Sequence, residues 1–160
     1  MTGKTHLIGG ATASAAYVAI TNHPDPISIF GAGLAGAVIP DICHGGSKIG
    51  RKFPILSKII NIIFGHRTFT HSLIFLVLAT LPLWIFLNSA IAIGFLIGVA
   101  SHLILDAATH SGIELFYPWK EKIRFPITIR TGGIAEYFVF AVLAIGTMYF
   151  GMDVLNQHFL

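Results

Sequence analysis

Six histidine and aspartate residues have side chains of the kind that bind divalent metal ions, and all of them stand beside apolar stretches. Imidazole nitrogen and carboxylate oxygen are common ligands of zinc, manganese and related ions. Ionisable groups at membrane depth are costly unless they are paired, solvated or bound to a cation. The set therefore predicts a site for a divalent metal ion, zinc in the first place, with manganese or magnesium as alternatives. Its members are His6, Asp41, His66, His71, His102 and Asp106.

The spacing of these residues supports such a site locally. His102 and Asp106 are four positions apart, so one face of a helix presents both. His66 and His71 are five apart, which fits a loop that leads into a helix. Asp41 ends an apolar stretch, where the helix dipole disfavours an anion and a nearby cation would stabilise it. A single residue of this kind is more often a cap or an interface residue, whereas the whole set favours a common partner.

Three further residues are candidates for catalysis. Arg67 lies within the histidine pair, where a guanidinium could bind phosphate or carboxylate charge, with contact to lipid headgroups as the alternative. Glu136 and His110 lie near the same helix ends and could carry protons. The sequence contains no GxSxG, Walker A, HExxH or CxxC motif. Serine-nucleophile hydrolysis, P-loop chemistry, zincin and zinc-ribbon interpretations therefore lack support.

Five apolar stretches must position these side chains. The chain has 160 residues, of which 54% are hydrophobic and 11% charged, outside the usual balance of a soluble domain. We expect an all-α fold, a polytopic membrane helix bundle of about five transmembrane helices, with residues 1–160 as a single domain. Glycine and alanine are frequent in the first two stretches, which predicts closely packed helices there. The stretches are Leu7–Asn22, Ile27–Cys43, Ser72–Leu87, Ala90–Asp106 and Ile134–Met152.

The long connection after the second stretch contains a segment, residues 53–65, with apolar and polar residues on separate faces of a helix. Pro54 stands where that helix could begin. A short helix in the membrane interface is the natural interpretation, and a buried core helix is the alternative. We therefore expect interfacial helical loops between the membrane spans.

All ten lysine and arginine residues lie before the first apolar stretch or in the two long connections. If the five helices alternate in direction, these regions share one side, which the positive-inside rule makes cytoplasmic. The chain is then a multi-pass protein of the inner (plasma) membrane, with the N-terminus in the cytoplasm and the C-terminus outside. The net charge of +3 lies beside apolar runs, which predicts anionic lipid headgroups as partners, with no direct binding of nucleic acid. The sequence does not predict the oligomeric state.

Four motifs, in this order along the chain, resemble those of the YdjM-like family of bacterial and archaeal membrane proteins. They are THLIGG with His6, PDICH with Asp41, HRTFTHS with His66 and His71, and SHLILDAATHSG with His102 and Asp106. The family is described as membrane metal-dependent hydrolases and also as LexA-binding inner-membrane proteins. The resemblance implies a membrane-embedded hydrolase whose metal ligands come from those six residues.

The chain departs from the family pattern at two positions. The usual PDxDH motif would place a second carboxylate where Cys43 stands, and a glycine often occupies the position of Thr68. The first departure removes a carboxylate that could bind a second metal ion, although a thiolate also binds zinc.

The sequence therefore predicts a metal-dependent hydrolase at the cytoplasmic leaflet, with a phosphoester of a membrane lipid or lipid-linked substrate as its target. The rival hypothesis is a membrane-anchored regulator in which the same residues form a structural metal site. A metal or proton transporter ranks last, because an ion path would place ionisable groups near the middle of the bilayer.

Overall fold

The structure is a computed structural model that describes residues 1–65 and 67–160, so the predicted ligand His66 lies outside the described residues. All named elements of the described chain are helical, which confirms the predicted all-α fold. The α-helices are α1 (Gly3–Thr21), α2 (Pro26–Gly36), α3 (Lys48–Lys52), α4 (Pro54–Phe64), α5 (Leu73–Phe86), α6 (Ser89–Ala107) and α7 (Ile134–His158). Two 3₁₀ helices, η1 (Ile39–Cys43) and η2 (Phe69–His71), precede α3 and α5.

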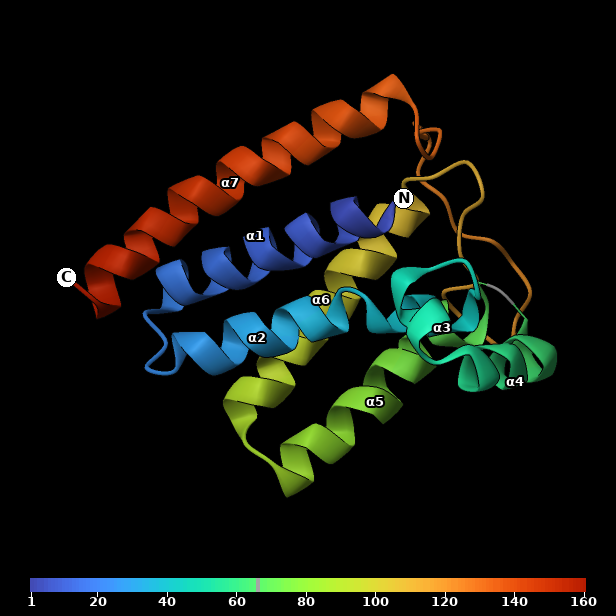
Figure 1. The fold of residues 1–160 in the computed structure, drawn as a ribbon, viewed down its shortest axis with the longest axis horizontal. Helices are drawn as coiled ribbons and strands as arrows, with labels where there is room; N and C mark the ends of the chain where they lie inside the picture. Colours follow the sequence, from blue (N-terminus) through green and yellow to red (C-terminus); the bar gives the residue numbers. More distant parts are fainter. Residues whose placement is uncertain (66) are drawn as a thin grey trace.

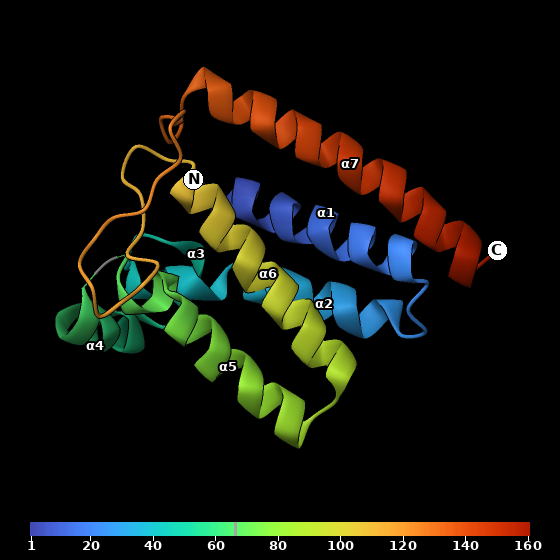
Figure 2. The same cartoon turned by 180° about the vertical axis from the view of Figure 1, so that it is seen from behind.

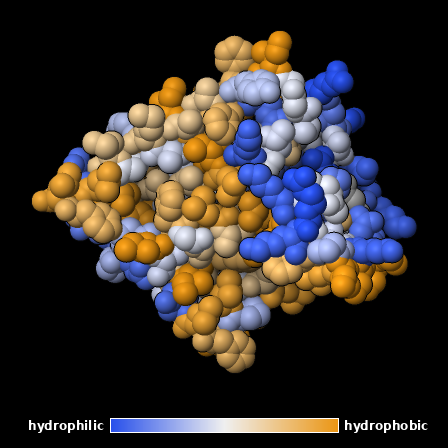
Figure 3. All heavy atoms as spheres, viewed as in Figure 1, coloured by the Kyte–Doolittle hydropathy of each residue, from blue (hydrophilic) through white to orange (hydrophobic). Residues whose placement is uncertain are grey.

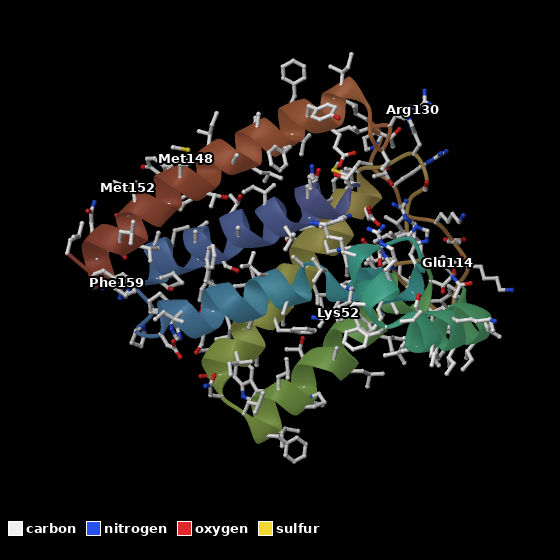
Figure 4. All side chains as sticks on the ribbon, viewed as in Figure 1. Lys52, Glu114, Arg130, Met148, Met152 and Phe159 are labelled. Carbon is white, nitrogen blue, oxygen red and sulfur yellow. The ribbon has the colours of Figure 1, made fainter. Side chains whose placement is uncertain are left out.

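The helices form a bundle with one polar end. Figures 1 and 2 show α1 between α7 and α2, with α6 crossing this layer and α5 packed on the other side of α6. One end of the bundle, at the right of Figure 1, gathers several segments: the starts of α1 and α7, the end of α6, the short helices α3 and α4, and the loop 108–133. Hydrophilic residues gather there in Figure 3, and the labelled Arg130 and Glu114 lie there in Figure 4. We refer to this region as the polar end.

Close contact between α2 and α6 forms the centre of the bundle. A Cβ atom at Gly98 of α6 would overlap the carbonyl oxygen of Gly33 in α2, and one at Gly36 would overlap the carbonyl oxygen of Phe95. Only glycine permits this approach of two backbones. The close packing predicted for the glycine-rich second stretch is confirmed, and it fixes α6 against the end of α2.

Three segments are long and apolar enough to cross a membrane within the described part of the chain: Pro26–Cys43, Ser89–Ala107 and Ile134–His158. The sequence predicts about five transmembrane helices, so two of the predicted spans do not meet this criterion. The 14-residue α5 is too short on its own, while the small residues of α1 lower its hydropathy. Large apolar side chains on α5 and α7 are nevertheless exposed, among them Phe86, Ile145 and Met148. A lipid environment would cover them.

The second apolar stretch does not continue as one helix. Helix α2 ends at Gly36, and the chain turns into η1, which carries Asp41. Pro40 explains the break, because proline lacks a backbone N–H and disfavours the α-helical conformation at Ile39. The break turns Asp41 away from the axis of α2, toward η2 and α6.

Helix α4 confirms the helix predicted within residues 53–65. Its polar Ser57 is buried, and Asn61 donates a hydrogen bond to the carbonyl of Cys43 over 2.8 Å. Ile55 and Ile62 are exposed. The polar face of α4 therefore packs on the protein and the apolar face points outward, which argues against a buried core helix and agrees with a helix in the membrane interface.

Candidate metal centre

Four of the predicted ligands meet at the polar end. Asp41 from η1, His71 from η2, and His102 and Asp106 from α6 each offer a ligand atom within 4.8 Å of those of the others. The side chains of His71, His102 and Asp106 are fully buried, and that of Asp41 is 19% exposed. Residues from three separate elements thus place two imidazoles and two carboxylates around one point.

The two imidazoles face each other and both carboxylates. Their Nε2 atoms are 3.2 Å apart. The Nε2 of His71 lies 3.4 Å from Oδ2 of Asp106 and 3.7 Å from Oδ1 of Asp41. The Nε2 of His102 lies 3.8 Å from the same two oxygens. Nitrogen and oxygen atoms that converge in this way suit a divalent cation.

The backbone of α2 sets the orientation of the His102 ring. Its Nδ1 lies 2.8 Å from the carbonyl oxygen of Ala37, the residue that follows α2. A carbonyl can only accept a hydrogen bond, so Nδ1 carries the proton. In the neutral ring, Nε2 then presents a lone pair to the cluster, as a metal ligand must.

His71 is held between Thr70 and the carboxylates. Its Nδ1 lies 3.0 Å from the Thr70 hydroxyl, while Nε2 faces Asp106 and Asp41. Burial lowers the pKa of His71, but hydrogen bonds to Asp106 and Asp41 outweigh it and raise the pKa to about 10. The carboxylates therefore favour a positive charge at this point, which a metal cation would also supply.

Asp106 is the most heavily contacted member of the group. Its oxygens meet the amino group of Met1, the Nη2 of Arg67 at 3.2 Å and the Nε2 of His6 at 3.2 Å. Arg67 also donates to the Thr109 hydroxyl over 3.0 Å. Within the described chain, Oδ2 of Asp106 lies 3.2 Å from Nη2 of Arg67 and 3.4 Å from Nε2 of His71, but neither contact has the geometry of a good hydrogen bond. A buried carboxylate oxygen that lacks a well-formed hydrogen bond is costly, so it fits a metal ligand.

His6 lies directly beside the group of four. Its ring stacks on that of His102 with the ring centroids 3.7 Å apart. The side chain is buried, and within the described chain neither ring nitrogen has a partner in hydrogen-bonding geometry. The residue is thus close enough to Asp106 to join the site, as the sequence predicts, although it does not belong to the most compact set.

The donor set fits a divalent ion. Two imidazoles, each with a hydrogen bond at Nδ1, and two carboxylates that converge on one point are typical of metal sites in proteins. Asp41, His71, His102 and Asp106 would hold the ion. Nothing in this geometry selects one metal.

The remaining predicted residues lie around this centre. Glu136 is buried and accepts hydrogen bonds from Thr5 and from two backbone N–H groups, at 2.6–2.7 Å. These bonds join the start of α1 to the start of α7, a role that the sequence did not reveal. His110 is exposed and contacts Thr128. The buried Cys43 interacts with His71 but lies outside the group of four.

The centre borders a cavity. Asp41 and Arg67 help to line a space of 670 Å³ at the polar end, between the start of α1, the start of α7 and the segment that includes α3. A molecule in this cavity would therefore be able to reach one ligand and the neighbouring guanidinium.

The chain is similar to one family model and to individual bacterial proteins. A family model described as YdjM inner membrane protein matches residues 1–159. YvsG of Bacillus subtilis (strain 168) is 47% identical over 154 residues, which cover 94% of each chain. The inner membrane protein YdjM of Escherichia coli (strain K12) is 34% identical over 119 residues, which cover 70% of this chain and 61% of that protein. No solved structure shows significant similarity.

Proposed function

The chain belongs to the YdjM inner membrane protein family, and we propose that it is a metal-dependent hydrolase that acts at the cytoplasmic leaflet on a phosphoester of a lipid or lipid-linked substrate. The observation that carries this proposal is the convergence of Asp41, His71, His102 and Asp106, with the Nε2 of His102 aimed by the Ala37 carbonyl. The cavity beside Asp41 gives a substrate access to this point.

A bound divalent ion would supply Lewis-acid polarisation of a phosphoryl oxygen and lower the pKa of a water molecule. Zinc suits a site with two imidazoles, and manganese or magnesium are the alternatives. Arg67 is placed to bind the charge of the phosphoryl group. Glu136 and His110 remain the candidates for proton transfer. Glu136 lines the cavity, whereas His110 is exposed on the loop that follows α6.

Our proposal includes a multi-pass topology in which the polar end faces the cytoplasm. Its support is the distribution of lysine and arginine, which avoids the other end of the bundle. Labelling of the variants Lys52→Cys and Lys122→Cys with a reagent that does not cross the membrane tests this, with the parent chain, whose own Cys43 is buried, as the background. Labelling in intact cells would place these loops outside and contradict the topology.

The hydrolase proposal is tested by metal analysis of the purified protein, followed by assays on phospholipid and lipid-phosphate substrates. We expect bound metal in a fixed ratio to protein and hydrolysis that stops on chelation and returns with the metal. Bound metal without hydrolysis of any such substrate would favour the alternative.

That alternative is a membrane-anchored regulator with a structural metal site. The observation in its favour is the crowding around Asp106, where His6, Arg67 and the Met1 amino group all approach the same carboxylate. Structural zinc sites are closed by four protein ligands, while catalytic sites keep one position for water. X-ray absorption spectroscopy of the metal-loaded protein distinguishes the two by the number of protein ligands and of water ligands.

A further inference from the structure

The cavity at the polar end has basic residues on several of its sides. Lys4 comes from α1, Lys48 and Arg51 from α3, and Arg67 from the segment before η2. Lys4, Lys48 and Arg51 are exposed, and none of them forms an ion pair with a carboxylate in the described part of the chain. Their charges are therefore available to an anion.

The acidic groups of the cavity do not cancel this charge. Its two carboxylates are Asp41 and Glu136. They carry two negative charges against the four basic side chains of the cavity, and the oxygens of Glu136 already accept hydrogen bonds from Thr2, Thr5 and Gly132. The cavity is thus a positive site beside a metal centre, which suits a phosphate group.

Apolar side chains complete the lining. Val38 and Ile49 lie on one side, and Tyr137 and Phe140 of α7 on the other. Such a mixture fits an amphiphile better than a free anion, since a small hydrated ion gains nothing from apolar contacts.

A second cavity lies further along the same helix. It has a volume of 620 Å³ and an almost entirely apolar lining from α1, α2 and α7, including Met148 and Gly151. Met148 is labelled in Figure 4, away from the polar end. Tyr137 and Met148 are eleven residues apart, as are Phe140 and Gly151, so three helical turns bring each pair onto one face of α7.

The distance between the two cavities along α7 suits a lipid chain. Eleven residues of α-helix span about 16 Å. One leaflet of the hydrocarbon core is about 15 Å thick, half of the usual 30 Å. A chain that leaves the first cavity beside Tyr137 and follows α7 would therefore reach the second cavity within one leaflet.

We propose that the two cavities form one binding site for a phosphate-bearing lipid. Lys4, Lys48, Arg51 and Arg67 hold its headgroup next to the metal centre, and an acyl chain lies along α7 toward Met148. This inference rests on the proposed function in one respect: it takes the bound lipid to be the substrate. Binding itself needs no turnover and can be measured separately.

The test uses the full chain in nanodiscs of phosphatidylcholine that contain a trace of phosphatidic acid with a photoreactive acyl chain. We expect crosslinks on α7 between Tyr137 and Gly151. The double variant Lys48→Gln/Arg51→Gln should reduce crosslinking about 30-fold, since each of the two basic side chains contributes about 1 kcal/mol to binding of an anionic lipid. The matched control is Lys52→Gln/Lys58→Gln, which removes the same charge from neighbouring exposed positions outside the cavity lining and should retain crosslinking.

Two outcomes would overturn the lipid site. One is equal crosslinking in the cavity variant and in the control variant. The other is displacement of the probe by inorganic phosphate or glycerol 3-phosphate as readily as by unlabelled phosphatidic acid, which would reduce the site to a binder of free phosphate. Crosslinking on α7 without hydrolysis of any phosphoester would instead refute the proposed function and leave the lipid site standing. Metal-dependent hydrolysis of a lipid phosphoester without crosslinks on α7 would refute the lipid site and leave the proposed function standing.

Discussion

His102 of α6 and Ala37 at the end of α2 are joined by a hydrogen bond from the imidazole Nδ1 to the main-chain carbonyl over 2.8 Å. The carbonyls in the last turn of a helix lack partners within that helix, so the histidine also satisfies one of them. A single bond thus caps α2 and turns the Nε2 lone pair toward His71, Asp41 and Asp106. The ring orientation depends on how closely the two helices pack.

The His102–Asp106 pair should act as one unit in metal binding. We expect His102→Ala and Asp106→Ala each to weaken metal affinity by at least about 10- to 100-fold. Loss of a residue that only hydrogen-bonds to a metal ligand already has an effect of this size, and loss of the ligand itself should cost no less. The measurement is metal per folded molecule, by elemental analysis of the monodisperse chromatographic fraction. His110→Ala, at an exposed histidine, is the control and should keep the parent ratio. An unchanged ratio in both cluster variants would exclude the pair as ligands.

The contact of α2 with α6 should tolerate no added methyl group. Gly98→Ala would drive a Cβ atom into the Gly33 carbonyl, which we expect to destabilise the protein by about 1–3 kcal/mol and to reduce bound metal by displacing His102. Gly31→Ala is the control, because nothing lies within 4 Å of a Cβ at that position of α2. Thermal unfolding in detergent should show a lower Tm for Gly98→Ala and an unchanged or higher Tm for Gly31→Ala. Equal Tm values for the two variants would contradict the packing argument.

Arg67 should matter more for substrate than for metal. Its guanidinium bonds to Asp106 and Thr109 and lines the cavity. Arg67→Gln removes one charge-assisted contact worth about 1.5–3 kcal/mol, so we expect phosphoester hydrolysis to fall about 10- to 100-fold. Metal content should remain close to that of the parent. A variant that loses metal in parallel with activity would show instead that Arg67 supports the ligand Asp106.

Glu136 offers a way to separate a structural from a catalytic role. Its oxygens accept bonds from the start of α1 and from Gly132. In Glu136→Gln an amide N–H₂ would replace one acceptor, and we expect a loss of about 1–3 kcal/mol in stability with metal content unchanged. Chemical denaturation and metal analysis measure the two quantities. Glu121→Gln, at an exposed loop residue, should change neither. Full stability with lost hydrolysis would assign Glu136 to proton transfer.

Helix α6 could be predicted from the sequence because hydropathy changes sharply at both of its ends, whereas α2 ends at Gly36, before the end of the predicted stretch at Cys43. The stretch Ala90–Asp106 corresponds to α6 (Ser89–Ala107) within one residue at each end. The proximity of the candidate ligands could also be predicted. His71, His102 and Asp106 all stand where helices begin or end on the predicted cytoplasmic side. Alternation of direction brings such positions to the same end of a bundle.

Other features depend on the backbone and leave no trace in residue type. Nothing about Ala37 suggests that its carbonyl orients a histidine. The same holds for Glu136, where the donors include the N–H groups of Thr2 and Gly132, which any residue except proline would supply. The break after Gly36 is signalled only indirectly, by Pro40. Such contacts arise from tertiary packing.

Helix α4 links the candidate metal centre to the face of the protein that would contact lipid. In the proposed topology its outward isoleucines would set its height relative to the membrane surface, while Asn61 donates a hydrogen bond to the carbonyl of Cys43, two residues beyond the candidate ligand Asp41. A change in bilayer thickness or lateral pressure that shifts α4 is therefore passed to Asp41 through one hydrogen bond and a short piece of chain. The geometry of the candidate ligands would then depend on the surrounding lipid, so we expect metal affinity to differ between detergent and a bilayer.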